Sequence, residues 1–265
     1  MTGTYLRYVA LGDSQTEGMN DGDEIRGYRG WADRLAEQLT AVQPRLRYAN
    51  LAVRGRVTSD VRTEQLPIAL SLRPDLVTVL AGLNDLLRPR FDAVAVAGHL
   101  ESMFEALTGA GARVVAFTLP DPGLLVPAAR GLTRRTLDFN ARVREAAHRH
   151  GVTVVDLSVY PICTDRRLWS ADRLHLNALG HTRLAAAVAH ALDLPDGADL
   201  WTNPLEPQRK PSTWRRAGVE LRWAVSYVGP WLLRRALGKS SGDGRTAKRP
   251  TLAPARRWPE PDPVL

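Results

Sequence analysis

Apolar residues recur along residues 5–200 in two alternating patterns. Short runs that are apolar at nearly every position predict strands covered on both faces. We place these strands at 5–11, 46–53, 76–81, 113–119 and 152–157. Longer segments with helical periodicity lie between and after them, at 31–41, 57–72, 94–108, 132–150 and 177–192. This alternation predicts a parallel sheet whose strands are joined by crossover helices.

Five strand–helix units are enough for one doubly wound domain. Because strand–helix–strand crossovers are right-handed, few arrangements of the strands remain. We expect an α/β fold of the flavodoxin-like kind, a three-layer sandwich with a five-stranded parallel sheet in the order 2-1-3-4-5. This domain occupies residues 1–195, and a basic C-terminal extension follows it.

The charge is distributed unevenly along the chain. The 265 residues have a formal net charge of +8, yet residues 1–200 hold equal numbers of basic and acidic side chains. Residues 201–265 hold 13 Lys and Arg against 5 Asp and Glu. Since the folded domain is neutral, the high overall charge does not favour a nucleic-acid partner, and we expect none.

The extension divides into two segments. Residues 196–237 read as a proline-marked linker followed by a Trp/Arg-rich amphipathic helix from Trp214 to Leu237. This helix docks on the catalytic domain, makes peripheral contact with a membrane surface or, least favoured, binds nucleic acid through phosphates, and the interpretations stay open. Residues 238–265 are rich in Gly, Ser, Pro and Arg, so we expect a disordered basic tail.

Cysteine content and the first residues bear on location. The single cysteine, Cys163, cannot form an internal disulfide, and no Cys/His cluster has the spacing of a zinc site. The first 11 residues lack the features of a secretory signal, and no apolar run is long enough to span a bilayer. We therefore expect a cytoplasmic protein, peripheral at the inner membrane surface if the extension binds lipid.

Candidate chemistry gathers in the loops after the strands, where ligands bind in open α/β sheets. Ser14 follows the first strand, Gly55 the second and Asn84 the third, and an Asp-x-x-His motif, Asp172 to His175, follows the last. A serine nucleophile needs a base and an acid that orients the base, and His175 and Asp172 can supply them. Backbone N–H groups of Ser14 and Gly55, with the amide of Asn84, can stabilise an oxyanion.

Two further features adjoin these loops. Leu124, Leu125 and Val126 follow the fourth strand and either bind the acyl group of a substrate or pack on the sheet. Asp13 precedes Ser14, but successive residues in such a segment point in different directions, so we interpret Asp13 as an organiser of the loop.

This combination resembles the SGNH hydrolases, also called the GDSL family, over about residues 5–193. The matching blocks are Gly12-Asp13-Ser14 with Gly18, then Gly55, then Gly82 to Asp85, and finally Asp172 to His175. The resemblance implies a catalytic triad of Ser14, Asp172 and His175 and an oxyanion hole of Ser14, Gly55 and Asn84. It also implies esterase or lipase activity without cofactor or metal. Gln15 departs from the family's name, in which leucine stands at that position.

The function that we expect is hydrolysis of carboxylic ester or thioester bonds through an acyl-enzyme on Ser14, with a small-molecule or lipid ester as substrate. An acyltransferase would use the same triad, with an alcohol in place of water. A non-catalytic lipid- or partner-binding protein, attached through the basic tail, is the third interpretation. The sequence leaves the three open, together with acyl length and oligomeric state.

Overall fold

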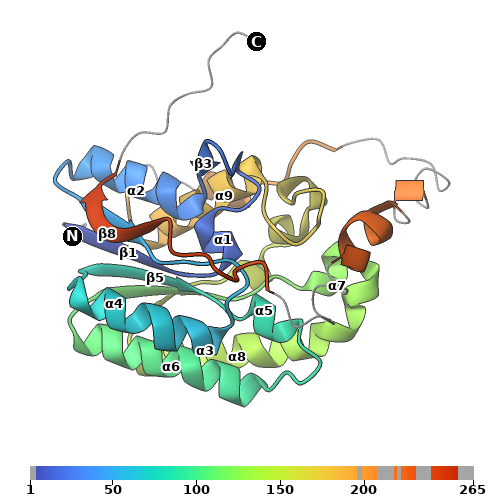
Figure 1. Ribbon diagram of the computed structural model, residues 1–265, viewed down its shortest axis with the longest axis horizontal. Coiled ribbons are helices and arrows are strands. Elements are labelled where there is room, and N and C mark those ends of the chain that lie inside the picture. The colour runs from blue at the N-terminus through green and yellow to red at the C-terminus, as the bar shows by residue number, and fades with distance from the viewer. Residues whose placement is uncertain (1–3, 196–198, 208–217, 220–221, 231–239, 256–265) are drawn as a thin grey trace, which may run out of the picture.

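The computed structural model describes residues 4–195, 199–207, 218–219, 222–230 and 240–255. Within these residues the chain forms a three-layer α/β sandwich around a six-stranded sheet in the order β7-β6-β5-β1-β4-β8 (Figure 1). The strands are β1 (Arg7–Gly12), β4 (Arg47–Asn50), β5 (Leu76–Leu80), β6 (Arg113–Phe117), β7 (Thr153–Val155) and β8 (Arg249–Pro254). A short hairpin, β2 (Gly22–Asp23) and β3 (Gly27–Tyr28), stands apart from this sheet.

The five predicted strands are all present and parallel, in the predicted order. Every residue of β5 is buried, and so is every residue of β1 after the first. Burial on both faces explains why these runs are continuously apolar. The flavodoxin-like architecture is therefore confirmed, with one added strand.

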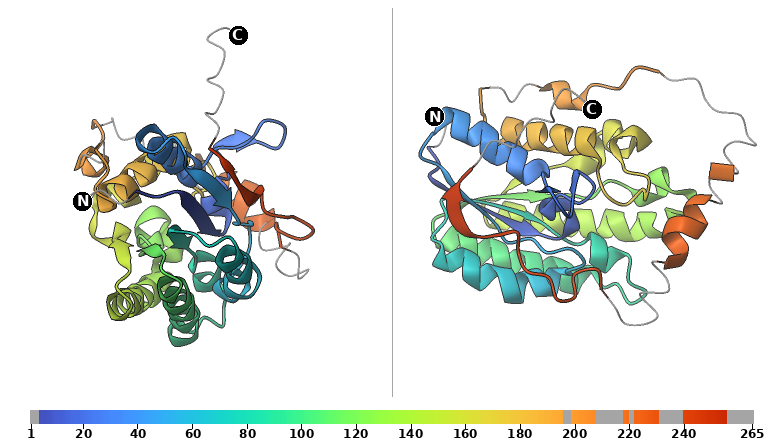
Figure 2. Two further views of the ribbon diagram at one scale, coloured as in Figure 1. Left: turned by 90° about the vertical axis from the view of Figure 1, so that its left-hand side faces the viewer. Right: turned by 45° about the horizontal axis from the view of Figure 1, so that its top comes forward.

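Helices cover both faces of the sheet (Figure 2). On one face lie α2 (Trp31–Val42) and α9 (Ala178–Ala191). The other face carries α3 (Thr58–Asp60), the π-helical turn η1 (Val61–Gln65), α4 (Leu66–Ser71), α6 (Ala93–Gly109) and α8 (Thr133–Arg149). The remaining helical turns are α1 (Ser14–Glu17), α5 (Leu83–Leu86), α7 (Pro122–Leu125), η2 (Pro127–Leu132), η3 (Leu157–Val159), η4 (Pro161–Thr164), η5 (Arg166–Leu168), η6 (Asp199–Thr202) and η7 (Ala224–Val228).

The sixth strand corrects the prediction of a disordered tail. Residues 240–255 lie on the domain, and β8 pairs antiparallel with β4, covering an edge that the predicted sheet would have left open. The guanidinium of Arg249 lies 5.1 Å from the ring centre of Tyr48 on β4. Backbone pairing, charged contacts and the packing of Leu252 and Ala255 against the core hold this segment. Two apolar residues among basic residues and prolines do not form a strand pattern in the sequence. Residues 256–265 lie outside the described part.

The predicted amphipathic helix falls largely outside the described residues. Residues 218–219 and 222–230 are helical or π-helical. The indole Nε1–H of Trp223 donates to the carbonyl oxygen of Asp172 at 3.0 Å, which agrees with docking on the catalytic domain. In the part of the chain that the structure describes, no helix is both long and apolar enough to cross a membrane.

Candidate active site

Ser14 begins α1 immediately after the central strand β1. The side chain of Asp13 caps this helix by accepting a hydrogen bond from the N–H of Gln15 at 3.1 Å. At the end of β1, the buried side-chain amide of Gln65 accepts a hydrogen bond from the N–H of Gly12 at 2.9 Å and donates one to its carbonyl oxygen at 2.8 Å. The end of β1 is thus fixed by side chains as well as by the sheet, so Ser14 has a defined position.

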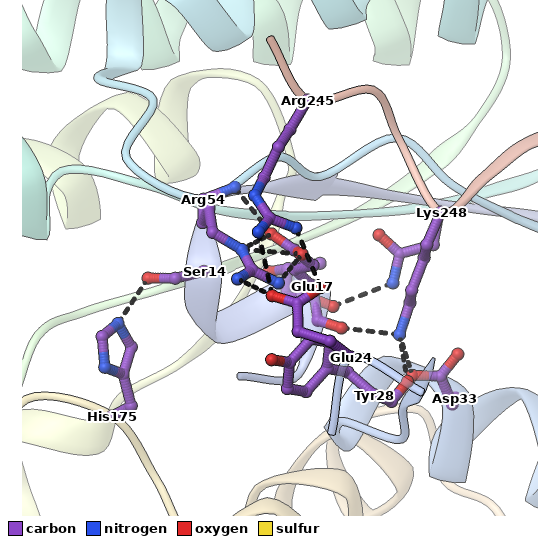
Figure 3. A network of polar contacts seen from close by, with 11 residues as sticks. Ser14, Glu17, Glu24, Tyr28, Asp33, Arg54, His175, Arg245 and Lys248 are labelled. Carbon is purple, nitrogen blue, oxygen red and sulfur yellow. Dashed lines mark hydrogen bonds and ion pairs between the residues drawn. The ribbon is translucent and has the colours of Figure 1, made fainter. Parts of the chain in front are cut away.

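His175 connects Ser14 to a carboxylate. Its Nε2 lies 2.8 Å from the Oγ of Ser14 (Figure 3), and its Nδ1 lies 2.8 Å from an oxygen of Asp172. The other oxygen of Asp172 accepts the backbone N–H groups of Leu174 and His175, both at 3.0 Å. Asn20 donates to this carboxylate at 2.7 Å. The three residues predicted from the sequence therefore form one continuous relay of hydrogen bonds.

The charge of Asp172 is favoured by these contacts. Burial alone would raise its pKa, but the hydrogen bonds from His175 and from the backbone outweigh burial and lower the pKa to about 2. An ionised carboxylate at Nδ1 requires that nitrogen to carry the proton, which leaves Nε2 as the acceptor that faces the serine hydroxyl. In this arrangement Nε2 can accept the hydroxyl proton of Ser14.

Gln15 holds the histidine loop, a role that sequence reasoning missed. Its Nε2 donates to the carbonyl oxygen of Leu174 at 2.7 Å, and its Oε1 accepts the N–H of Leu176 at 3.2 Å. The two hydrogen bonds fix the position of the backbone on both sides of His175. The only signal in the sequence was that Gln15 replaces the leucine of the family's name.

Gly55 and Asn84 flank the serine from the neighbouring strand ends. Gly55 has a φ of +78°, a conformation that favours glycine. The side-chain amide of Asn84, on α5, donates to a carboxylate oxygen of Asp13 and to the carbonyl oxygen of Arg56, both at 3.0 Å. Asp13 thus orients Asn84 as well as capping α1, and burial raises the pKa of Asp13 to about 6.

Arg54, beside Gly55, anchors its turn to the serine helix. It is 4% exposed, and its guanidinium pairs with Glu17, the last residue of α1. The backbone N–H of Arg54 also donates to Glu17 at 2.7 Å. The turn that carries Gly55 and the helix that carries Ser14 are therefore joined through one buried ion pair.

An apolar cleft of about 90 Å³ lies beside the relay. The chain neighbours of Ser14 and His175 line part of it: Asp13, Gln15, Leu174 and Leu176. Most of the other lining residues are apolar. They are Leu80, Ala81, Leu83, Leu119, Pro120, Pro122, Leu125, Leu157, Ile162, Cys163, Leu168, Trp169, Arg173, Gly180, Arg183, Leu184 and Trp201. Such composition suits an uncharged hydrocarbon group.

The expectation for the loop after β6 needs correction. Of its three apolar residues only Leu125 is buried and lines the cleft. Leu124 is 69% exposed, and Val126 does not contribute to the wall. Because α7 is a single helical turn, the neighbouring side chains of Leu124 and Leu125 point in different directions, and of these two only Leu125 lines the cleft.

Similar solved structures share the fold. The acetylxylan esterase Axe2 from Geobacillus stearothermophilus matches with a TM-score of 0.61 at 17% identity, covering 75% of this chain and 99% of that one. The lipase Lip_vut3 from a goat rumen metagenome matches with a TM-score of 0.59 at 19% identity, covering 72% and 99%. LAE5, an alpha/beta hydrolase enzyme from the metagenome of Lake Arreo in Spain, has a TM-score of 0.60 at 21% identity, covering 71% and 95%.

Sequence comparison identifies the family. None of the curated proteins matches the chain significantly. The model of the GDSL-like lipase/acylhydrolase family, however, matches residues 10–183, which hold the whole relay together with Gly55 and Asn84. The match and the fold confirm the resemblance seen in the sequence: the chain belongs to the GDSL-like lipase/acylhydrolase family and is a GDSL-type esterase.

Proposed function

We propose that this protein hydrolyses acyl esters through an acyl-enzyme on Ser14. Ser14 Oγ attacks the carbonyl carbon while its proton passes to Nε2 of His175. The imidazolium, stabilised by Asp172, then gives this proton to the leaving alkoxide or thiolate, and the acyl-enzyme remains. A water molecule loses a proton to His175, attacks the acyl carbon and releases the acid, and the proton returns to Ser14. The unbroken Asp172–His175–Ser14 relay carries this proposal.

The proposed oxyanion hole consists of the N–H groups of Ser14 and Gly55 and the side chain of Asn84. These donors lie at neighbouring strand ends, as stabilisation of a tetrahedral intermediate requires. The contact with Asp13 holds the amide of Asn84 at the site, and its second N–H must leave the carbonyl oxygen of Arg56 to reach the substrate oxygen.

We assign the acyl chain of the substrate to the apolar cleft that Leu125 lines. Its volume of about 90 Å³ is smaller than the roughly 150 Å³ of a cavity that accepts benzene. A short acyl chain therefore fits better than a long one. Short-chain esters are accordingly the substrate class that the site favours.

Substitution of Ser14 tests the proposal. Ser14→Ala should abolish hydrolysis of p-nitrophenyl acetate while circular dichroism and the unfolding temperature stay close to wild type. Ser102→Ala, on the exposed surface of α6, is the matched control and should retain the full rate. A folded Ser14→Ala protein that hydrolyses the ester at the wild-type rate would remove Ser14 from the mechanism.

A further inference from the structure

Residues 240–255, here called the C-terminal strap, lie beyond the part of the chain that matches the family. The strap runs from the turn at Gly55 to the outer edge of β4, where it becomes β8 (Figure 1). Closing the edge of the sheet needs only β8. Residues 240–248 do not pair with β4; they contact the Arg54–Gly55 turn and α1, and also Glu24, Tyr28 and Asp33.

The start of the strap is seated directly on the Arg54–Gly55 turn. A Cβ placed on Gly55 would collide with Oγ of Ser240, and one placed on Gly242 would collide with the carbonyl oxygen of Arg54. Gly242 is buried by this contact. The side chain of Asp243 accepts the N–H of Ser240 at 2.8 Å, which keeps the strap turn closed. Two turns far apart in the sequence therefore pack backbone against backbone.

An ionic bridge adds to this contact. Glu24 accepts a hydrogen bond from Arg54 at 2.9 Å and two from Arg245 of the strap, at 3.0 and 2.9 Å. Figure 3 shows Glu24 between the two guanidinium groups. The hydrogen bond from Arg245 is the largest influence on Glu24 and, with the bond from Arg54, lowers its pKa to about 2.

The strap also contacts α1, the helix that begins at Ser14. The ammonium of Lys248 donates to the carbonyl oxygen of Glu17, at the end of α1, at 2.6 Å, and to that of Tyr28 at 2.9 Å. Its third partner is the carboxylate of Asp33. Three N–H groups thus find three acceptors, and one of these acceptors belongs to the helix that begins at Ser14.

We propose that the C-terminal strap is a positioning element for this esterase, which holds the peptide of Gly55 at the correct place relative to Ser14. A glycine in a turn has no side chain to fix its orientation, so its neighbours must do so. Oxyanion donors act only when they are held within about 0.5 Å of the productive geometry. The strap supplies this constraint by contact at Gly242 and by ion pairing at Arg245. The inference rests on the function proposed above.

Variants of the strap test this role. Arg245→Ala removes the ionic bridge, and Gly242→Ala forces the strap away from the carbonyl oxygen of Arg54. Thr251→Ala is the matched control, because Thr251 lies on β8 with an exposed side chain. Rates of p-nitrophenyl acetate hydrolysis are divided by the concentration of active sites, titrated with a fluorophosphonate, so that loss of folded protein does not count as loss of catalysis.

Both strap variants should lower kcat per titrated site about tenfold or more while KM stays within about twofold, because only transition-state stabilisation is lost. Arg245→Lys should recover part of the rate, since an ammonium can still pair with Glu24. The midpoint of the acid limb of the pH–rate profile should not move, because the His175–Asp172 pair is untouched.

Three outcomes would overturn the inference. The first is an unchanged kcat per site in both variants, and the second is an equal loss in Thr251→Ala, which would make the effect one of sheet stability. The third is a shifted acid limb, which would place the effect at a titrating group beside Ser14 rather than at the peptide of Gly55. Failure of the proposed function looks different: the wild type itself would then neither hydrolyse the ester nor react with the fluorophosphonate.

Discussion

Replacement of Gln15 by leucine is the sharpest test of how the histidine loop is held. Leucine is similar in size to glutamine but cannot form the two hydrogen bonds of the side-chain amide. The carbonyl oxygen of Leu174 and the N–H of Leu176 therefore lose their partner. Gln15 is 6% exposed and Leu176 is 9% exposed, so water has little access to the N–H of Leu176, whereas Leu174 is half-buried. An unpaired buried polar group costs about 1–3 kcal/mol.

The expected cost is about 2–6 kcal/mol if both groups stay unpaired, part of it in stability and part in catalysis. The loop can relax by moving His175, and each 1.4 kcal/mol of lost transition-state stabilisation lowers the rate about tenfold. We therefore expect Gln15→Leu to lower kcat about 10- to 100-fold per titrated active site and to lower the urea midpoint of unfolding.

The assay is p-nitrophenyl acetate hydrolysis with active-site titration, accompanied by urea denaturation. Gln38→Leu, the same substitution at a half-buried position of α2 away from the loop, is the control. Gln15→Glu keeps an acceptor for Leu176 but buries a carboxylate whose second oxygen faces the carbonyl oxygen of Leu174, so it should lose at least as much rate as Gln15→Leu. Wild-type rate and stability in Gln15→Leu would refute the claim that Gln15 holds the loop.

Three further predictions concern the neighbouring groups. Asn84→Ala should lower kcat by about 10²–10³ with little change in KM, measured by steady-state kinetics, as for loss of one oxyanion donor. Because burial raises the pKa of Asp13 from 3.8 to about 6, wild type should gain stability as the pH falls through 6 toward 4, whereas Asp13→Asn should not. Urea unfolding at pH 7 and pH 4 should show a relative change of about 2 kcal/mol in favour of wild type at pH 4, and no change would contradict the buried charge. Leu125→Trp should fill the acyl cleft and reduce the rate on p-nitrophenyl butyrate more than on the acetate; an equal effect on both esters would place the acyl chain elsewhere.

The strand order and the relay were predictable because they depend on local signals. Five apolar runs define buried parallel strands, and the carboxyl ends of such strands meet at one edge of the sheet. Residues as distant as Ser14 and His175 could therefore be brought together from topology alone. The short Asp-x-x-His spacing then fixed the partner of the histidine.

Features held by distant polar contacts gave no such signal. The pattern of β8 reads as a basic, proline-containing tail, because its stability comes from pairing with β4 and from contacts of Lys248 and Arg249. The role of Gln15 depends on backbone groups more than 150 residues away in the chain. The exposure of Leu124 depends on how one helical turn is rotated, which composition does not determine.

The most direct test of the account is the site of covalent modification. The protein is treated with a fluorophosphonate, digested and analysed by peptide mass spectrometry, with Ser14→Ala treated in parallel. The account predicts one phosphonylated residue, Ser14, in the wild type and no modification in the variant. Modification of a different side chain, or an active enzyme that remains unmodified, would contradict it.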